Sequence, residues 1–376
     1  MTETNAELAY LFRHALLRDA AYDLQLPAQR RQLHGLALTI IEATYPDSER
    51  DAIAAELAVH ARLADQPRVE LAYSWRAAAF ARAKHDPEAL HWLEAAARLE
   101  DDPVRRADAL LRAGDLLLQS GLADQAQPRM QQSLEIARTA GDRQLEGSAL
   151  HKLAVVDLVR GRMDQAYARL EQAMDIACQC GDGETEAMAL TNLASIKRSR
   201  GLTTEAFALQ QQALDAHRAA GNQRGESLAL GNIAVYLFDT GQWEQALHCG
   251  EQAAAMALQS GNRRTHGIAH GNMGVVLAKL GRLPEAAQSF RQALATHKDI
   301  YNRPYEAFDR CRYALVLLAL GDAQAARAQW RQGHEQMLAY GDAADLGITL
   351  QEMRQACDQA PVAHFDTNVP EARQGA

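Results

Sequence analysis

Residues 181–221 read GDGETEAMALTNLASIKRSRGLTTEAFALQQQALDAHRAAG, and this stretch decides the fold. It contains two runs with apolar residues at helical spacing, Glu184–Ser199 and Thr204–Ala219, separated by a turn at Gly201. Glycine after a helix adopts the left-handed C-terminal cap conformation without steric cost. Because only three or four residues join the two runs, we expect two antiparallel helices that form a hairpin and expose one apolar face to a neighbouring hairpin.

The same pattern recurs along the chain with a period of 40 residues. One series of turn glycines comprises Gly121, Gly161, Gly201, Gly241, Gly281 and Gly321. A second series comprises Gly141, Gly181, Gly221, Gly261 and Gly341. Tyr301 occupies the slot in the second series that would otherwise hold glycine, with Asn302 beside it. This regularity predicts an array of stacked helical hairpins rather than separate globular domains.

Small residues occupy fixed places in each hairpin. The first helices carry one seven residues before the turn glycine: Gly114, Ala154, Ala194, Ala234, Gly274 and Ala314. The second helices carry alanine five residues after it: Ala126, Ala166, Ala206, Ala246, Ala286 and Ala326. A further small residue follows seven positions later: Ser133, Ala173, Ala213, Ala253, Ala293 and Gly333. Small side chains at these places let paired helices approach closely, because the distance between two helix axes depends on the side chains at the contact.

With this signature, the region from about Ala107 to Ala356 resembles the tetratricopeptide repeat. The resemblance implies an all-α, right-handed α-solenoid of helical hairpins. The usual period of that repeat is about 34 residues, so the six extra residues here imply about 9 Å more helix in each hairpin. The forms GNQRGESLALGNIAVYL, at 221–237, and GNRRTHGIAHGNMGVVL, at 261–277, resemble the 40-residue repeats of the Leu-Gly-Asn family and of MalT-like bacterial regulators.

Residues 8–64 do not follow the repeat. They resemble the junction between the winged-helix region and the repeats of bacterial signalling ATPases of the STAND type, some of which also carry cyclase domains. The residues that carry this resemblance are Phe12, His14, Leu17, Ala21, Tyr22, Arg30, Leu33, His34, Glu56, Leu57 and His60. No GxxxxGK[ST] phosphate loop occurs in the sequence, so the resemblance implies a sensor arm whose ATPase would be a separate polypeptide or part of a longer reading frame.

Three segments follow from these patterns. We expect a helical junction segment at residues 1–64, an array of about seven repeats with a capping helix at 65–360, and a disordered tail at 361–376. Charged Glu352 and Arg354 give the last helix the polar outer face that a terminal repeat needs. N-cap acceptors for the helices are predicted at Asp142, Asp164, Thr203 and Thr204.

Composition excludes several classes of partner. The formal net charge is −9 and no run of lysine and arginine occurs, so we expect no nucleic-acid binding. No stretch approaches 18 uncharged apolar residues and no apolar leader occurs, so we expect a cytoplasmic protein without a membrane partner. The five cysteines are interpreted as small buried hydrophobes in a reducing compartment: Cys178, Cys180, Cys249, Cys311 and Cys357.

One column of the repeat is a candidate partner-binding site. The position two residues before the small residue of each first helix holds Arg112, Lys152, Asn192, Asn232, Asn272 and Arg312, followed by Glu352. In tetratricopeptide domains this position faces the concave groove. Asparagine offers a donor and an acceptor to an extended peptide, and a flanking cation adds a charge-assisted bond, so we expect a protein or an extended, acidic peptide as the ligand. The alternative is that the three asparagines join one repeat to the next by structural hydrogen bonds.

No catalytic site, cofactor or metal is expected. His266 and His270 are four residues apart on a helix, a spacing that can bind a metal, but no HExxH motif accompanies them and position 270 holds leucine in sister repeats. A catalytic site would have to break the repeat pattern at one place, and we expect no such break. A protein-interaction module, acting as a regulatory scaffold or sensor, is therefore the favoured function. The alternative is a sensor that encloses a small-molecule inducer, as the MalT-like forms imply.

Overall fold

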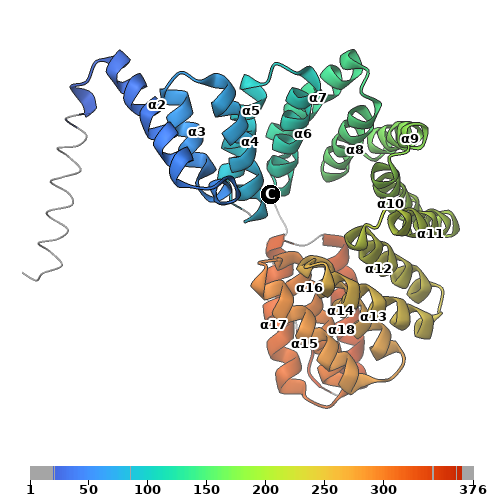
Figure 1. Cartoon of the computed structure of the whole chain (residues 1–376). Helices are drawn as coiled ribbons and strands as arrows, with labels where there is room; N and C mark the ends of the chain where they lie inside the picture. Colours follow the sequence, from blue (N-terminus) through green and yellow to red (C-terminus); the bar gives the residue numbers. More distant parts are fainter. Residues whose placement is uncertain (1–19, 21, 85, 341–342, 361, 366–376) are drawn as a thin grey trace, which may run out of the picture. The chain divides into compact units, whose positions relative to one another are not determined.

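The computed structural model describes residues 20, 22–84, 86–340, 343–360 and 362–365. Every regular element in these residues is helical, and successive helices pack as antiparallel neighbours (Figure 1). The chain divides into two compact units, Met1–Ile176 and Ala177–Ala376, which are described separately. The predicted all-α solenoid of helical hairpins is confirmed. None of the helices in the described part of the chain combines the length and the apolar character needed to cross a membrane.

The first unit contains helices α2 to α8 and most of α9. Their bounds are α2 Pro27–Thr44, η1 Asp47–Ile53, α3 Ala54–Leu63, α4 Pro67–Ala83, α5 Glu88–Leu99, α6 Pro103–Gln119, α7 Ala123–Ala140, α8 Arg143–Val159 and α9 Met163–Cys180. One buried cluster joins α2 to α5 around Leu57 and Leu93, and another joins α6 to α9 around Met130 and Leu153. Within the first cluster, α4 and α5 pack together as a hairpin that precedes α6.

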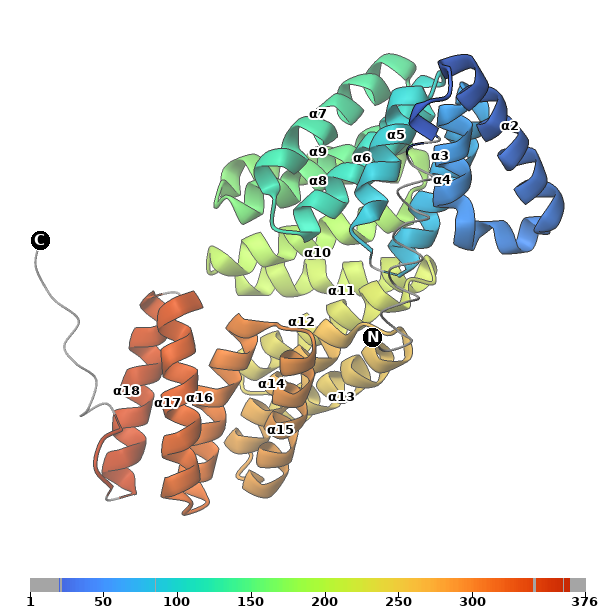
Figure 2. The same cartoon turned by 90° about the vertical axis from the view of Figure 1, so that its left-hand side faces the viewer.

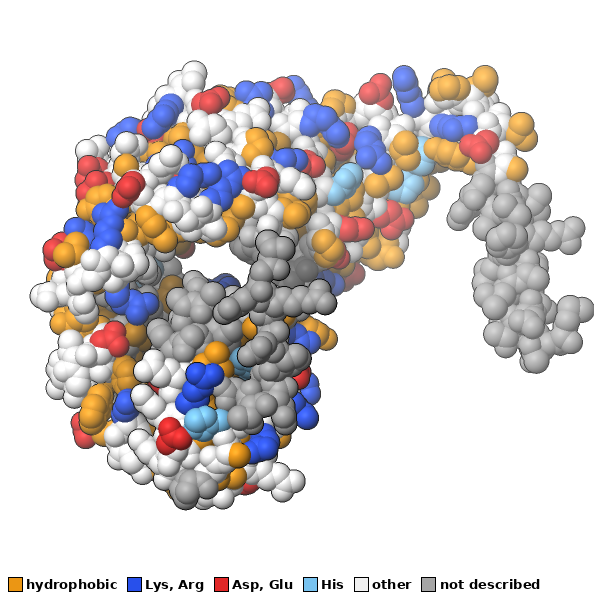
Figure 3. Space-filling model, turned by 180° about the vertical axis from the view of Figure 1, so that it is seen from behind, with side chains coloured by type: hydrophobic (Ala, Val, Ile, Leu, Met, Phe, Trp, Pro, Cys, Tyr) orange, Lys and Arg blue, Asp and Glu red, His pale blue; other side chains and the backbone are white. Residues whose placement is uncertain are grey.

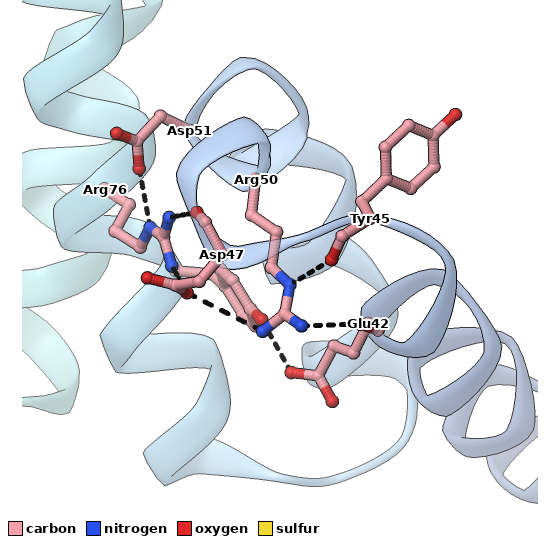
Figure 4. Close-up of polar contacts among 7 residues, drawn as sticks. Glu42, Tyr45, Asp47, Arg50, Asp51 and Arg76 are labelled. Carbon is pink, nitrogen blue, oxygen red and sulfur yellow. Dashed lines mark hydrogen bonds and ion pairs between the residues drawn. The ribbon is translucent and has the colours of Figure 1, made fainter.

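A polar network fixes the start of this unit (Figure 4). Arg76 of α4 donates from Nη1 to Asp47 Oδ1 and from Nε to Asp51 Oδ1, both at 2.6 Å. Arg50 of η1 donates to the carbonyl oxygen of Glu42, at the end of α2, at 2.5 Å. The hydrogen bond from Arg76 lowers the pKa of Asp47 below its ordinary value. The short η1 helix is therefore tied both to α2 and to the first hairpin.

The outer face of α2 is apolar. Leu33, Leu36 and Ile40 are each about half exposed and share one face of the helix, while Leu38 points into the core. Hydrophobic side chains gather at this end of the molecule in Figure 3. This end of the described stack therefore lacks the polar surface that normally covers a terminal repeat.

The second unit continues the repeat (Figure 2). Its helices are α10 Gly183–Ser199, α11 Thr203–Ala219, α12 Gln223–Asp239, α13 Trp243–Gln259, α14 Arg263–Lys279, α15 Leu283–Asp299, α16 Arg303–Ala319, α17 Ala323–Tyr340 and α18 Ala343–Gln359. In α18, Met353 and Cys357 are buried against α16 and α17, whereas Glu352 and Arg354 are exposed, as expected of a capping helix. Val362 and Phe365 also pack on this cluster. The rest of the predicted disordered tail, residues 361 and 366–376, lies outside the described residues.

The repeat pattern dictates the turns and the close helix contacts. The ten described glycines of the two series have φ between 64° and 88°, which is the left-handed conformation predicted for them. Tyr301 adopts the same conformation, with φ of 54°, although its Cβ makes this costly. Among the small residues, Gly274 is required by contact: a Cβ there would lie 2.7 Å from Cε2 of Phe290. The predicted small positions are therefore places where α-helices touch.

Two predictions from sequence need correction. Asp142 accepts from the backbone N–H of Leu145 and caps α8 as predicted. Asp164, Thr203 and Thr204 instead lie inside the first turns of α9 and α11, because these helices start one or two residues earlier than predicted. The second error concerns the cysteines: Cys311 and Cys357 are buried and Cys249 is half-buried, but Cys178 and Cys180 are exposed near the end of α9.

A candidate ligand pocket in the second unit

A pocket of about 650 Å³ lies in the second unit, on the face formed by the first helices of successive hairpins. Three residues of the predicted column line it: Asn232 from α12, Asn272 from α14 and Arg312 from α16. They converge because α14 packs against both α12 and α16, and a period of 40 residues gives each helix the same orientation. Arg198, at the end of α10, and Asp239, at the end of α12, add one charge of each sign.

The three column residues differ in their surroundings. Asn232 Nδ2 donates to Gln210 Oε1 of α11, although the distance of 3.4 Å makes this a weak bond. The half-buried Asn272 has no hydrogen-bond partner among the described residues. Arg312 places its guanidinium carbon 4.1 Å from the centre of the Phe308 ring, a cation–π contact on its own helix. The alternative that the asparagines form structural hydrogen bonds between repeats therefore applies in part to Asn232.

The pocket walls are apolar. Phe238 of α12, Met273 of α14 and Phe308 of α16 line it together with Tyr305, which lies in the first turn of α16. Arg264 of α14 places its guanidinium carbon 6.0 Å from the centre of the Tyr305 ring. A concave, mostly apolar surface with a few convergent amides and cations is the usual composition of a ligand site.

The other predicted column residues do not join this pocket. Arg112 and Lys152 belong to the first unit, and each is engaged by a carboxylate. Arg112 Nε lies 2.8 Å from Asp108 Oδ1 on the same helix, and Lys152 Nζ lies 2.7 Å from Asp115 Oδ1 of α6. Asn192 is half-buried on α10 and does not line the pocket. The structure thus brings together three of the six predicted residues.

Sequence reasoning missed a buried pair behind the pocket wall. His297 of α15 and Asp309 of α16 are 0% and 4% exposed, with Nε2 and Oδ2 3.4 Å apart. Burial raises the pKa of Asp309 above its ordinary value. The pair departs from the repeat pattern at Asp309. The signal was present in the repeat column of Asp309, which holds Thr349 in the following repeat and alanine in the five preceding repeats: Ala109, Ala149, Ala189, Ala229 and Ala269.

The histidine pair of α14 is a packing feature. The rings of His266 and His270 meet edge to face with centres 4.6 Å apart. Burial, and then the charge of His266, lower the pKa of His270 to about 4. Ser289 Oγ donates to the carbonyl oxygen of His270 at 3.1 Å. Among the residues that the structure describes, no group of three or more histidine, cysteine or acidic side chains could hold a metal ion.

Four of the residues that carry the junction resemblance contact one another: Tyr22, Arg30, His34 and His60. Tyr22 Oη lies 2.9 Å from His34 Nε2, and His34 Nδ1 lies 2.9 Å from His60 Nδ1. Arg30 stacks on the Tyr22 ring, and Leu57 is fully buried beside them. The remaining residues of the resemblance lie outside the described residues: Phe12, His14, Leu17 and Ala21. The described cluster links α2 to α3.

Comparison with known proteins agrees with this architecture. Two tetratricopeptide repeat family models match the chain, one over residues 105–179 and 185–259 and the other over 271–304. No curated protein sequence is significantly similar.

Solved structures share the fold at low sequence identity. A Rap protein complexed with competence and sporulation factor is 13% identical, with 89% of this chain and 98% of that chain covered and a TM-score of 0.58. The quorum sensor NprR from B. thuringiensis, in its apo form, is 16% identical over 79% of this chain and 89% of that chain, with a TM-score of 0.53.

A third structure is a signal transduction ATPase with numerous domains, from Pyrococcus horikoshii, that carries a tetratricopeptide repeat sensor. It is 16% identical, with a TM-score of 0.57, and 88% of this chain is covered. The chain spans 50% of the length of that protein. The repeat models and the shared fold lead to one assignment: this chain carries tetratricopeptide repeats, and its fold is similar to that of a STAND ATPase with a tetratricopeptide repeat sensor.

Proposed function

We propose that this protein is a protein-interaction module, acting as a regulatory sensor or scaffold, and that it holds an extended segment of its partner in the pocket of α12, α14 and α16. Tetratricopeptide repeats are typically non-catalytic interaction modules. One observation carries the proposal: Asn232, Asn272 and Arg312 converge on one apolar pocket within a single unit. The repeat array proposed at residues 65–360 is then the scaffold that presents them.

The amides suit an extended backbone. Packed helices lie about 8–10 Å apart, so equivalent residues on α12 and α14 are separated by about three residues of an extended chain. Each asparagine side chain can donate to a peptide carbonyl and accept from a peptide N–H. Asn272, which has no partner among the described residues, would make these bonds without breaking any others.

The remaining groups select side chains of the ligand. The guanidinium of Arg312 would bind a carboxylate, either a side chain or a chain terminus, as a charge-assisted hydrogen bond. Phe238, Met273 and Phe308 would contact an apolar side chain. We expect micromolar affinity, about −8 kcal/mol.

A set of labelled peptides tests this proposal. The probes are fluorescein-labelled heptapeptides in which leucine or phenylalanine alternates with aspartate, and the comparison set carries lysine in place of aspartate. Fluorescence anisotropy should show tighter binding of the acidic set. Loss of a charged contact costs about 1.5–3 kcal/mol, so Arg312→Gln should weaken binding by about 10- to 100-fold.

The repeat offers a matched control. Asn272→Ala should weaken binding, whereas Asn192→Ala, at the same column position but outside the pocket, should leave the dissociation constant unchanged. Equal effects of the two variants, or no binding of any acidic peptide, would contradict the proposal.

A small-molecule sensor is the second candidate function. The pocket volume of about 650 Å³ falls within the range of 300–1,000 Å³ that is usual for small-ligand sites. Thermal unfolding in the presence of either the peptide set or a panel of sugars separates the two candidates. A ligand that binds the native state raises the unfolding midpoint, so a rise with sugars alone would favour the small-molecule function.

A signalling ATPase is the partner that the fold comparison supports. The Pyrococcus protein joins an ATPase to a tetratricopeptide sensor, and this sequence contains no phosphate loop. The reading frame upstream of Met1 is the simplest test, because an in-frame phosphate loop there would place the ATPase in the same polypeptide. Without one, co-purification with a separate ATPase would be the expected result.

A further inference from the structure

The hairpin of α15 and α16 contains two buried polar side chains where sister repeats are mostly apolar. Asp309 stands where five other repeats have alanine, and His297 stands where four sister positions hold Ala137, Ala177, His217 and Ala257. The space for the two larger side chains comes from α14. A Cβ at Gly267 would lie 2.7 Å from His297 Cε1, and a Cβ at Gly271 would lie 2.6 Å from Asp309 Oδ1. The three helices are thus shaped around this pair.

The stack does not need a charged pair at this place. Replacing a buried ion pair by apolar residues is often neutral or stabilising, and the sister repeats pack with alanine in the Asp309 column. The facing atoms, His297 Nε2 and Asp309 Oδ2, are buried 3.4 Å apart, and neither has a hydrogen-bond partner among the described residues. On its other side, His297 Nδ1 lies 3.3 Å from Nδ2 of Asn302. The pair therefore points to a role other than stability.

The pair is linked to the ligand pocket through α16. Asp309 lies on α16 directly after Phe308 and three residues before Arg312, both of which line the pocket. The ring centre of His297 lies 5.7 Å from that of Tyr305, a third pocket residue of the same helix. Rotation or translation of α16 would move all three pocket residues together.

We propose that His297 and Asp309 are positioning residues, which hold α16 in register with α15 and α14, and that protonation of the buried Asp309 makes ligand binding in the pocket depend on pH. This inference rests on the proposed function of the pocket. It concerns regulation of that site and involves no contact between the pair and the ligand.

The charges around the pair are few. The α14 residues nearest the pair are Gly267 and Gly271, which carry no charge. The turn before α16 contributes the neutral Asn302. On α16, the guanidinium of Arg312 acts on Asp309, and the Tyr305 ring lies beside His297. The titratable side chains of α14 are Arg263, Arg264, Lys279 and the two histidines His266 and His270, whose rings contact each other. The buried Glu306 of α16 is paired with Arg303 and Arg310. His297 and Arg312 are the neighbours that act on the Asp309 carboxyl.

The direction of the pH effect follows from proton counting. In the unfolded chain an aspartate binds a proton only below about pH 4. In the folded protein, burial raises the pKa of Asp309, so its carboxyl retains the proton to higher pH. The contribution of Asp309 to stability is therefore fully present below about pH 4, and it decreases as pH rises through the raised pKa, because the folded state binds more protons than the unfolded state. Ligand affinity should decrease in the same direction.

The test compares the wild type with two variants from pH 5 to 8. The double variant His297→Ala/Asp309→Ala restores the residue type of most sister repeats, and Asp309→Asn keeps the shape without the charge. The readouts are the unfolding midpoint without ligand and the dissociation constant of the acidic heptapeptide probe. A single linked proton changes affinity by at most about tenfold per pH unit, so we expect a loss of about threefold or more between pH 6 and 8 in the wild type. Both variants should lose this dependence.

The outcomes separate the two proposals. Wild type and double variant with the same pH dependence of the midpoint would overturn the role of Asp309 protonation. A difference in the midpoint without a difference in peptide binding would overturn the positioning role. If no peptide binds the wild type at any pH, the proposed function itself fails, while the midpoints still decide whether protonation of Asp309 affects stability.

Discussion

The space around Asp309 gives the sharpest test of this structure, because the repeat supplies a matched control. Gly271 and Gly231 occupy equivalent places on α14 and α12. A Cβ at Gly231 would meet no atom within 4 Å, whereas a Cβ at Gly271 would lie 2.6 Å and 2.7 Å from the two carboxylate oxygens of Asp309. The same substitution, glycine to alanine, should therefore have opposite effects at the two sites.

The magnitudes follow from two effects. Alanine in a helix interior is favoured over glycine by about 1 kcal/mol, and Gly231→Ala should gain up to that amount. Gly271→Ala gains the same helix propensity but overfills a packed site, which costs about 1–3 kcal/mol and more where the neighbour cannot move. Asp309 is enclosed, so we expect the cost to prevail, with Gly271→Ala less stable than Gly231→Ala by about 2 kcal/mol.

Calorimetry of the full chain measures the difference, using the transition of the second unit. Repeat arrays need not unfold in a single step, so midpoints rather than extrapolated free energies are compared. A third variant completes the cycle: in an Asp309→Ala background, Gly271→Ala should cease to be destabilising. If Gly271→Ala raises the midpoint as much as Gly231→Ala, the carboxylate does not occupy the space assigned to it.

Three further predictions concern other sites. Tyr301→Gly should stabilise the fold by about 0.5–1 kcal/mol, because glycine relieves the left-handed strain and the lost side chain is mostly exposed. Calorimetry should show a slight rise in the unfolding midpoint, and a large fall in the midpoint would contradict this. Asp157 is fully buried and paired with Arg162 and Arg169, so removing both arginines should lower the free energy of unfolding of the first unit by about 3–5 kcal/mol. Urea unfolding measures this, and a loss of less than about 1 kcal/mol would refute the pairing. His270, with a pKa of about 4, should show constant ring chemical shifts in NMR spectra from pH 8 to 6. The free energy of unfolding should fall from about pH 6.5 towards pH 4, because the histidine of the unfolded chain binds a proton, and His270→Leu should lack this contribution.

Much of the fold could be predicted from sequence because the determinants are local and repeated. A glycine that must be left-handed and an alanine that must fit between helices recur every 40 residues, so the helices and turns around Gly201 could be placed within a residue or two. The N-caps were harder. Asp164 and Thr203 are good capping residues, but α9 starts before Asp164 and α11 starts at Thr203, and residue type alone does not settle such a boundary.

The candidate site was predicted only in part, for reasons that lie in side-chain pairing. Repeat spacing identified the column, but it could not show that Lys152 would pair with Asp115, 37 residues away on another helix. Nor could it show that only Asn232, Asn272 and Arg312 would line the same pocket. The column comparison could have revealed Asp309, since one carboxylate among five buried alanines is visible in the sequence.

The departures from the repeat gather in the hairpin that completes the pocket, and this explains how a uniform array can acquire a specific site. Tyr305 and Phe308 are aromatic where the four preceding repeats have no aromatic residue. Residues that recur in every repeat satisfy the stacking of one hairpin on the next, and they therefore carry no information about a particular ligand. Residues that differ in one repeat are not needed for stacking, and the buried Asp309 places a carboxyl where stacking needs only a small apolar residue. Selectivity should therefore depend on α16: substitutions of Tyr305 or Phe308 should change which ligand is bound, whereas equivalent substitutions on α10 should change stability alone.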